Sequence, residues 1–93
     1  MEITKHCYQR AKERYSLNKD SFERMVVKAI ELGKKPTDFK GRIRKYLDKM
    51  TNEHNTVPVI FGEYLFFFAE NYSKLVTTYQ LPSKYKPYLS KRN

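Results

Sequence analysis

The apolar residues of this chain change their spacing near Asn55. Before Asn55 they recur every three or four positions, which is typical of one face of an amphipathic helix. After Asn55 they form short runs rich in Val, Thr, Phe and Tyr, separated by turn residues, as in strands. The pattern therefore predicts a helical front part and a strand-rich back part.

The first two predicted helices have clear start signals. Thr4 can cap a helix over residues 5–15, and Asn18 or Asp20 can cap a second one. A side-chain oxygen at this position accepts a hydrogen bond from an otherwise free backbone N–H group. We expect the second helix to end at Gly33, because glycine readily adopts the left-handed conformation that ends helices. Its apolar face has the strongest period in the chain and consists of Phe22, Met25, Val26, Ala29 and Ile30.

A third helix is predicted from Thr37 or Asp38 to Met50. We expect its first turn to be irregular, because Gly41 costs about 1 kcal/mol relative to alanine inside a helix. Residues 51–55 are predicted to form a polar loop. The apolar face of this helix consists of Phe39, Ile43, Tyr46, Leu47 and Met50.

Strands are predicted at residues 56–61, 64–69 and 74–81. Short strands joined by short turns are typical of an antiparallel meander, and Pro58 indicates that the first strand is an edge or is bulged. We therefore predict an α+β fold, with two or three N-terminal helices packed on one face of a small antiparallel β-meander of three or four strands. Residues 1–82 would form this single domain, and residues 83–93 a flexible basic tail.

The charge balance favours a polyanionic partner. The 93 residues include 19 Lys and Arg but 10 Asp and Glu, which gives a net charge of +9. Such an excess creates a positive field around a small protein. The candidate nucleic-acid-binding residues are Lys34, Lys35, Lys40, Arg42, Arg44, Lys45 and Lys49, extended by Lys84 and Lys86. The alternative is a solvated helix face, although such faces usually mix charges. The binding hypothesis requires the cations to gather on a single surface.

Several classes of protein are not indicated by the sequence. The longest apolar run covers residues 64–69, far fewer than the roughly 20 that a membrane helix needs. The N-terminus lacks the apolar segment of a secretory signal, and the single Cys7 cannot form an internal disulfide. We therefore expect a reducing, cytoplasmic setting. One cysteine and two histidines do not make a zinc-binding pattern, so neither a metal nor another cofactor is expected.

The first predicted helix carries the best candidates for chemistry. His6, Arg10 and Arg14 follow one another at intervals of four residues and form one polar stripe. Histidine can transfer a proton near neutral pH, and arginines can stabilise the charge of a pentacovalent phosphate. In the competing interpretation, Arg10 only pairs with Glu13 and His6 only decorates the first turn.

The last predicted strand can complete such a site. Thr77, Thr78 and Tyr79 follow one another there, and alternate residues of a strand share a face. A strand hydroxyl opposite the helix could position a phosphate. Tyr79 could instead belong to the core.

These segments together carry a resemblance. Ile3 to His6, followed by Arg10, Arg14, a capped second helix, a short meander and Val76 to Tyr79, resembles the RelE-type and colicin-type small endoribonuclease toxins. It also resembles small proteins of phages and mobile elements. The resemblance spans about residues 3–82 and implies that His6, Arg10 and Arg14, with Thr78 or Tyr79, surround a scissile phosphate. The basic third helix and the three-stranded meander depart from this pattern.

We therefore expect an RNA-binding domain and, as the sharper hypothesis, a metal-independent endoribonuclease that leaves a 2′,3′-cyclic phosphate. The alternative is a non-catalytic phage or mobile-element inhibitor, like an anti-CRISPR protein, that binds a host nuclease or nucleoprotein. A plain nucleic-acid-binding accessory domain is the third hypothesis. The expected partners are RNA or another polyanion, a host nucleoprotein or a cognate antitoxin, and not a membrane.

Overall fold

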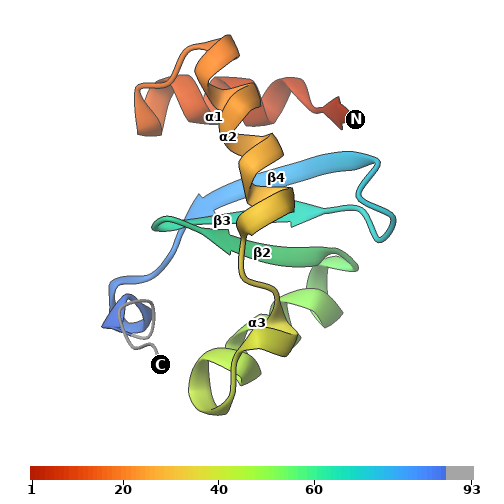
Figure 1. The fold of residues 1–93 in the computed structure, drawn as a ribbon, viewed down its shortest axis with the longest axis vertical. Helices are drawn as coiled ribbons and strands as arrows, with labels where there is room; N and C mark the ends of the chain where they lie inside the picture. The colour runs from red at the N-terminus through yellow and green to blue at the C-terminus, as the bar shows by residue number, and fades with distance from the viewer. Residues whose placement is uncertain (88–93) are drawn as a thin grey trace.

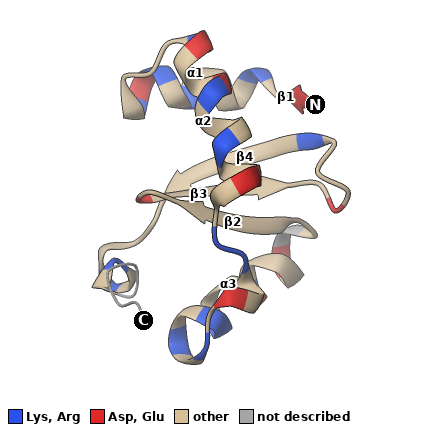
Figure 2. Cartoon of the chain, viewed as in Figure 1, with Lys and Arg blue, Asp and Glu red and all other residues tan. Residues whose placement is uncertain are grey.

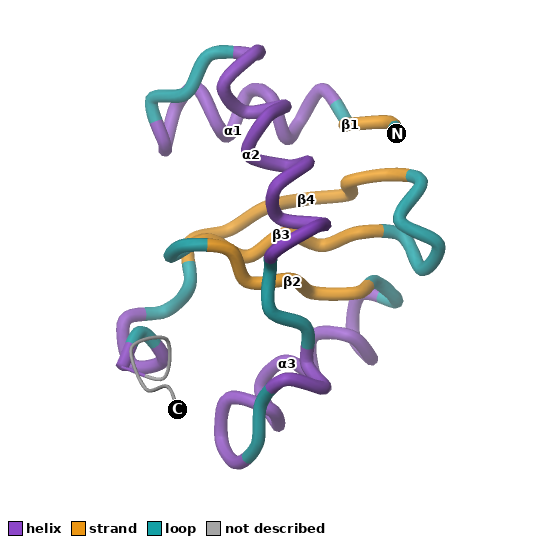
Figure 3. Tube along the Cα trace, viewed as in Figure 1, coloured by secondary structure: helices purple, strands orange, loops and turns teal. Residues whose placement is uncertain are grey.

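A four-stranded sheet lies between two layers of helices (Figure 1). The computed structural model describes residues 1–87 and every side chain among them except that of His54. In chain order, the elements are β1 (Glu2–Ile3), α1 (Lys5–Tyr15), α2 (Lys19–Leu32), the 3-10 turn η1 (Pro36–Asp38), α3 (Gly41–His54), β2 (Val57–Phe61), β3 (Tyr64–Phe68), β4 (Lys74–Gln80) and the 3-10 turn η2 (Ser83–Tyr85). In Figure 3, α2 crosses in front of the strands, with α1 above β4 and α3 below β2.

The sheet is a meander with one added strand. Its order is β1-β4-β3-β2, in which β2, β3 and β4 pair antiparallel and the short β1 pairs parallel to β4. The predicted α+β class is confirmed, and so is the edge position of the strand that contains Pro58. The sequence did not reveal β1, because a two-residue strand is too short to show a period.

Each face of the sheet has its own apolar core. The core under α1 and α2 consists of Cys7, Ala11, Phe22, Val26, Ala29, Val59, Phe66, Phe68 and Leu75. The core under α3 consists of Ile43, Leu47, Ile60, Leu65, Phe67 and Leu81. The prediction that two or three helices share one face holds for α1 and α2, whereas α3 covers the opposite face. The cause is β3, whose alternate side chains are apolar on both faces and need cover on both.

The predicted start signals of the first two helices are confirmed. Thr4 accepts a hydrogen bond from the N–H of Cys7, and Asn18 accepts one from the N–H of Ser21 at 2.8 Å. The third helix starts later than predicted: the turn η1 precedes it, and Gly41 enters it with a φ of +72°. It also continues through the predicted loop at residues 51–55 and ends at the left-handed Asn55.

Gly33 ends α2 for a reason other than the predicted one. Its backbone is extended, with φ of −66° and ψ of 158°, and not left-handed. A Cβ atom at Gly33 would lie 2.3 Å from both the carbonyl oxygen of Ala29 and Cγ1 of Val59. The next residue, Lys34, exchanges two backbone hydrogen bonds with Ile60, of 2.7 and 2.8 Å. Glycine is needed here because α2 approaches β2 so closely.

The beginning of the predicted tail packs on the domain. The turn η2 brings Tyr85 onto Tyr46 of α3, with ring centres 4.5 Å apart. The remainder of the predicted tail, residues 88–93, lies outside the described residues.

We predict that Gly33→Ala lowers the free energy of unfolding by about 1–3 kcal/mol, the usual cost of forcing extra atoms into a packed core. Denaturant unfolding measures this cost. Gly62→Asn is the control, because Gly62 has a φ of +62° in an open turn and asparagine tolerates that conformation. Equal stability of Gly33→Ala and the parent would contradict the close approach of α2 and β2.

We predict that stability at high pH depends on the contact between Tyr8 of α1 and Glu23 of α2. The Tyr8 hydroxyl donates a hydrogen bond to the Glu23 carboxylate, and this bond, with burial, raises the pKa of Tyr8 to about 12. The usual pKa of tyrosine is about 10. Because the folded-state pKa is the higher one, the contribution to stability is complete below about pH 10 and is lost as the pH rises from 10 to 12.

Unfolding measured across this window tests the contact. The free energy of unfolding should fall more steeply with pH in the parent than in Tyr8→Phe, which cannot ionise at this position. Glu23→Gln should lower the pKa of Tyr8 in a titration followed by NMR, whereas Glu31→Gln on the same helix should not. Parallel slopes for parent and Tyr8→Phe would argue against the contact.

Candidate functional site

Helix α1 and strand β4 lie side by side and run in the same direction (Figure 1). Four residues of a helix rise about 6 Å, and two residues of a strand rise about 6.5 Å. Helix positions four apart can therefore meet alternate positions of the strand. His6 lies beside Thr77, with 3.3 Å between Nε2 and Oγ1, and Arg10 lies over Tyr79, with Cζ 4.8 Å from the ring centre.

Two polar groups, the guanidinium of Arg10 and the hydroxyl of Thr77, converge on Nε2 of His6. Arg10 donates to Nε2 of His6 from Nε at 3.3 Å, and its Nη2 lies 3.2 Å from the same atom. Nε2 therefore acts as an acceptor, and the hydroxyl of Thr77 can donate to it as well. The side chain of His6 is exposed and that of Arg10 is half-buried. We call His6, Arg10, Thr77 and Tyr79 the edge cluster.

A β-bulge in β4 decides which residues enter the edge cluster. Leu75 pairs with Phe68 and Thr77 pairs with Phe67, so Val76 is an extra residue without a partner on β3. If Val76 instead held a regular, paired place in the strand, alternation would put Thr77 and Tyr79 on the face of Leu75, inside the core under α1 and α2. The bulge instead turns Thr77 and Tyr79 to the other face, where Tyr79 is 40% exposed.

Thr78 lies away from the edge cluster, although the resemblance placed it beside the phosphate. Its side chain is fully buried on the opposite face. Its hydroxyl donates to the carbonyl oxygen of Leu65 at 2.8 Å and lies 3.2 Å from the Tyr15 hydroxyl. Burial raises the pKa of Tyr15, partly offset by the bond to Thr78. Tyr15 thus remains a neutral donor, and Thr78 serves the core.

Arg14 lies one helical turn beyond Arg10 on the same stripe. It is exposed and lines a shallow hollow of about 240 Å³ together with His6, Gln9, Arg10 and Glu13. Arg10 contacts His6 and Tyr79, and no ion pair joins it to Glu13 in the described part of the chain. The competing interpretation of the stripe, an Arg10–Glu13 pair, is therefore not what the structure shows.

The structure brings together His6, Arg10 and Tyr79 of the predicted catalytic residues, places Arg14 next to them and sets Thr78 apart. Thr77 takes the place beside His6. The alternation of the strand indicated that Thr77 and Tyr79 share a face, but it could not tell which face points to solvent, because the bulge at Val76 leaves no mark in the spacing.

The predicted nucleic-acid-binding residues lie mostly around α3, across the sheet from α1. Figure 2 shows Lys and Arg on both sides of the sheet, so the expectation of a single cationic surface is not met. Some of these charges are paired: Arg44 with Asp48 at 3.0 Å, Lys49 with Glu53 at 3.9 Å and Lys86 with Glu63 at 3.2 Å. Lys35 and Lys84 lie over the rings of Tyr72 and Tyr85. Among residues 1–87, the exposed members with neither an ion pair nor a ring contact are Lys34, Lys40, Arg42 and Lys45.

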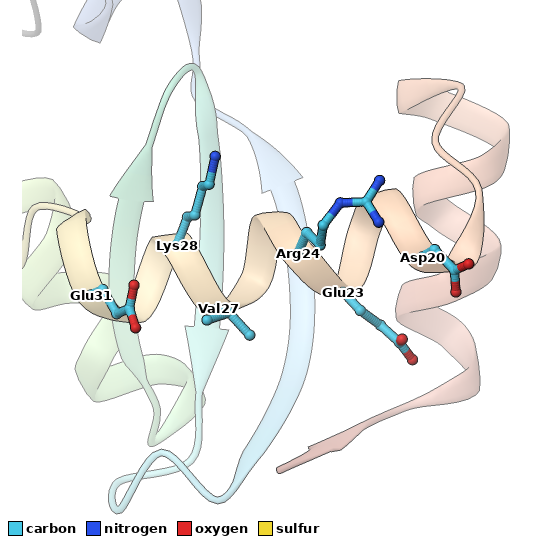
Figure 4. A pocket seen from close by; sticks show the side chains of 6 residues that line it. All are labelled: Asp20, Glu23, Arg24, Val27, Lys28 and Glu31. Atoms are coloured by element: carbon cyan, nitrogen blue, oxygen red, sulfur yellow. The ribbon is translucent and has the colours of Figure 1, made fainter.

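The outer face of α2 carries a second hollow, of about 440 Å³. Figure 4 shows Arg24 and Lys28 extending to one side of the helix, and Glu23 and Val27 to the other. Asp20 and Glu31 complete the lining, so both signs of charge are present. Val27 is 52% exposed, and Leu32 at the end of the helix is 66% exposed. This surface lies on one helix and does not include the edge cluster.

The chain matches no protein-family model, no curated protein and no solved structure. Among the described side chains, no three His, Cys, Asp or Glu residues gather closely enough to hold a metal ion. Within residues 1–87, no helix has both the length and the apolar character needed to cross a membrane.

We predict that removal of the hydroxyl lowers the stability of the protein at Thr78 but hardly changes it at Thr77. Thr78→Val leaves the Tyr15 hydroxyl without its buried acceptor and should cost about 1–3 kcal/mol in the free energy of unfolding. Thr77→Val, on the solvent side, should change stability by less than about 0.5 kcal/mol. Urea unfolding of both variants checks this, and a larger loss for Thr77→Val would contradict the assignment of the two faces.

Proposed function

We propose that this protein binds RNA at the edge cluster and cleaves it without a metal ion. The observation that carries the proposal is that the guanidinium of Arg10 and the hydroxyl of Thr77 both lie within 3.3 Å of Nε2 of His6, at an exposed edge. Transesterification of a phosphodiester needs a base for the 2′-hydroxyl, positive charge for the pentacovalent phosphate and a proton for the leaving 5′-oxygen, and the edge cluster offers the first two.

The cluster can divide the reaction among its residues. Arg10 and Thr77, which now donate to His6, would donate instead to the oxygens of a bound phosphate and leave Nε2 free as the base. His6 would take the proton of the RNA 2′-hydroxyl, and the 2′-oxygen would attack the adjacent phosphorus. The bond from phosphorus to the 5′-oxygen would break, and that oxygen would take a proton from solvent, to which the cluster is open. The products are a 2′,3′-cyclic phosphate and a 5′-hydroxyl.

The net charge of +9 favours a polyanionic partner, because it attracts polyanions over a long range. The exposed Lys40, Arg42 and Lys45 around α3 lie across the sheet from the edge cluster and do not form one surface with it, so the proposal rests on the edge cluster and not on a gathered cationic face. RNA is favoured over DNA because the proposed nucleophile is the 2′-hydroxyl, which DNA lacks.

We predict cleavage of RNA in the presence of EDTA, and no cleavage of a DNA oligonucleotide of the same sequence. His6→Ala should lower the cleavage rate by about 10²–10⁴-fold, the usual contribution of a general base. Arg10→Ala should lower it by about 10²–10³-fold, as for the loss of one group that stabilises transition-state charge. Product analysis by gel and mass spectrometry should show the cyclic phosphate.

Lys12→Ala is the matched control, because Lys12 lies on the other side of α1, in a hollow with Tyr8 and Lys19, and the variant removes the same unit of charge. Its rate should stay close to that of the parent. Cleavage that is absent in the parent, or undiminished in both His6→Ala and Arg10→Ala, would refute the catalytic proposal.

A second candidate function rests on the outer face of α2. Mixed charges around the exposed Val27 are suited to a protein partner and not to a phosphate backbone, which favours one sign of charge. This surface supports the alternative of a non-catalytic inhibitor, of phage or mobile-element type, that binds a host nuclease or nucleoprotein. The cleavage assay separates the two functions, because such an inhibitor leaves RNA intact.

A further inference from the structure

Arg14 extends the edge cluster along α1 without being part of it. His6 contacts Thr77 and Arg10 lies over Tyr79, whereas within residues 1–87 Arg14 makes no side-chain hydrogen bond, ion pair or ring contact. All three residues line the same shallow hollow. A free guanidinium next to a proposed phosphate site is itself a good phosphate ligand, since its planar fork matches two phosphate oxygens.

The spacing along α1 matches that of a nucleic-acid strand. Arg14 lies one turn beyond Arg10, about 6 Å along the helix axis. This rise is comparable to the separation of neighbouring phosphates in an extended single strand. A strand that places one phosphate at Arg10 can therefore place the next one at Arg14 without bending away from the helix.

Tyr79 supplies an aromatic surface beside this path. Tyr79 is 40% exposed, and its ring packs edge-on against that of Phe67, with ring centres 5.9 Å apart. A cationic track flanked by an aromatic ring is the usual arrangement for binding single-stranded nucleic acid, in which the bases are free to stack on protein side chains. In a duplex the bases are already stacked on one another and cannot reach the ring.

The one carboxylate in the hollow limits where the strand can lie. On a helix with its buried residues at Cys7 and Ala11, Glu13 and Gln9 project farther from β4 than Arg14 does. A phosphate near Glu13 would be repelled, so the backbone path is confined to the side of Arg14 that faces β4.

We infer that the substrate is a single-stranded RNA segment lying along α1, with one phosphate at the edge cluster, the neighbouring phosphate at Arg14 and a base stacked on Tyr79. This inference rests on the proposed function, and it makes Arg14 a positioning residue and not part of the reacting centre.

The test measures the affinity of a labelled single-stranded RNA octamer at several salt concentrations, with 2′-O-methyl groups to prevent cleavage. Arg14→Ala should weaken binding on the order of ten-fold and lower the slope of log affinity against log salt by roughly 0.7, the loss of one phosphate contact. Tyr79→Ala should also weaken binding on the order of ten-fold, and Tyr79→Phe should restore it. The blunt duplex of the same sequence should bind more weakly than the single strand.

Control variants separate this inference from a general effect of charge. Lys12→Ala removes the same charge from the far side of α1 and should leave the salt slope unchanged, whereas Glu13→Gln should strengthen binding. The inference is wrong if Arg14→Ala and Lys12→Ala behave alike, or if the duplex binds as well as the single strand. In either case, cleavage that depends on His6 and Arg10 would leave the proposed function standing. If the parent binds no RNA, both fail.

Discussion

The structure depends on a strand that is apolar on both faces. Phe66 and Phe68 of β3 pack under α1 and α2, while Leu65 and Phe67 pack under α3, and all four are buried almost completely. A strand of this kind cannot leave either face to water, so the chain must provide two separate covers. The link from α2 to η1 therefore passes from one side of the sheet to the other, which is why Gly33 has to lie so close to Val59.

The edge cluster follows from this layered arrangement through one irregularity. With both faces of β3 covered, the free space lies at the outer edge of β4, where β1 pairs only with Lys74 and Leu75. The extra residue Val76 exchanges the faces of the residues that follow, so Thr77 and Tyr79 lie on the face of Phe67 and Leu65, and the polar stripe of α1 meets them at the outer edge of β4. The similar rise of four helical and two strand residues then sets His6 against Thr77 and Arg10 against Tyr79.

Local signals in the sequence were sufficient for the elements but not for their arrangement. The caps at Thr4 and Asn18 and the period of α2 are local, and they predicted the first two helices closely. The position of α3 was not predicted, because an apolar stripe shows that a helix packs on the sheet but does not show which face of the sheet it covers. In the edge cluster, the spacing of His6 and Arg10 predicted the two residues that α1 contributes. The choice of Thr77 over Thr78 depended on a bulge that has no sequence signature.

The cationic stripe also has a structural use, and the two roles can be told apart. An open strand edge invites pairing with other chains, and charged side chains near it discourage such pairing. Thr4 adds to this protection by donating its hydroxyl to the carbonyl oxygen of Val76 at 3.3 Å. Protection of an edge needs only charge, which lysine supplies as well as arginine does. It does not require a histidine whose Nε2 accepts a hydrogen bond from an arginine and lies beside a threonine hydroxyl. Because protection of the edge does not explain this arrangement, the arrangement favours chemistry at the edge cluster.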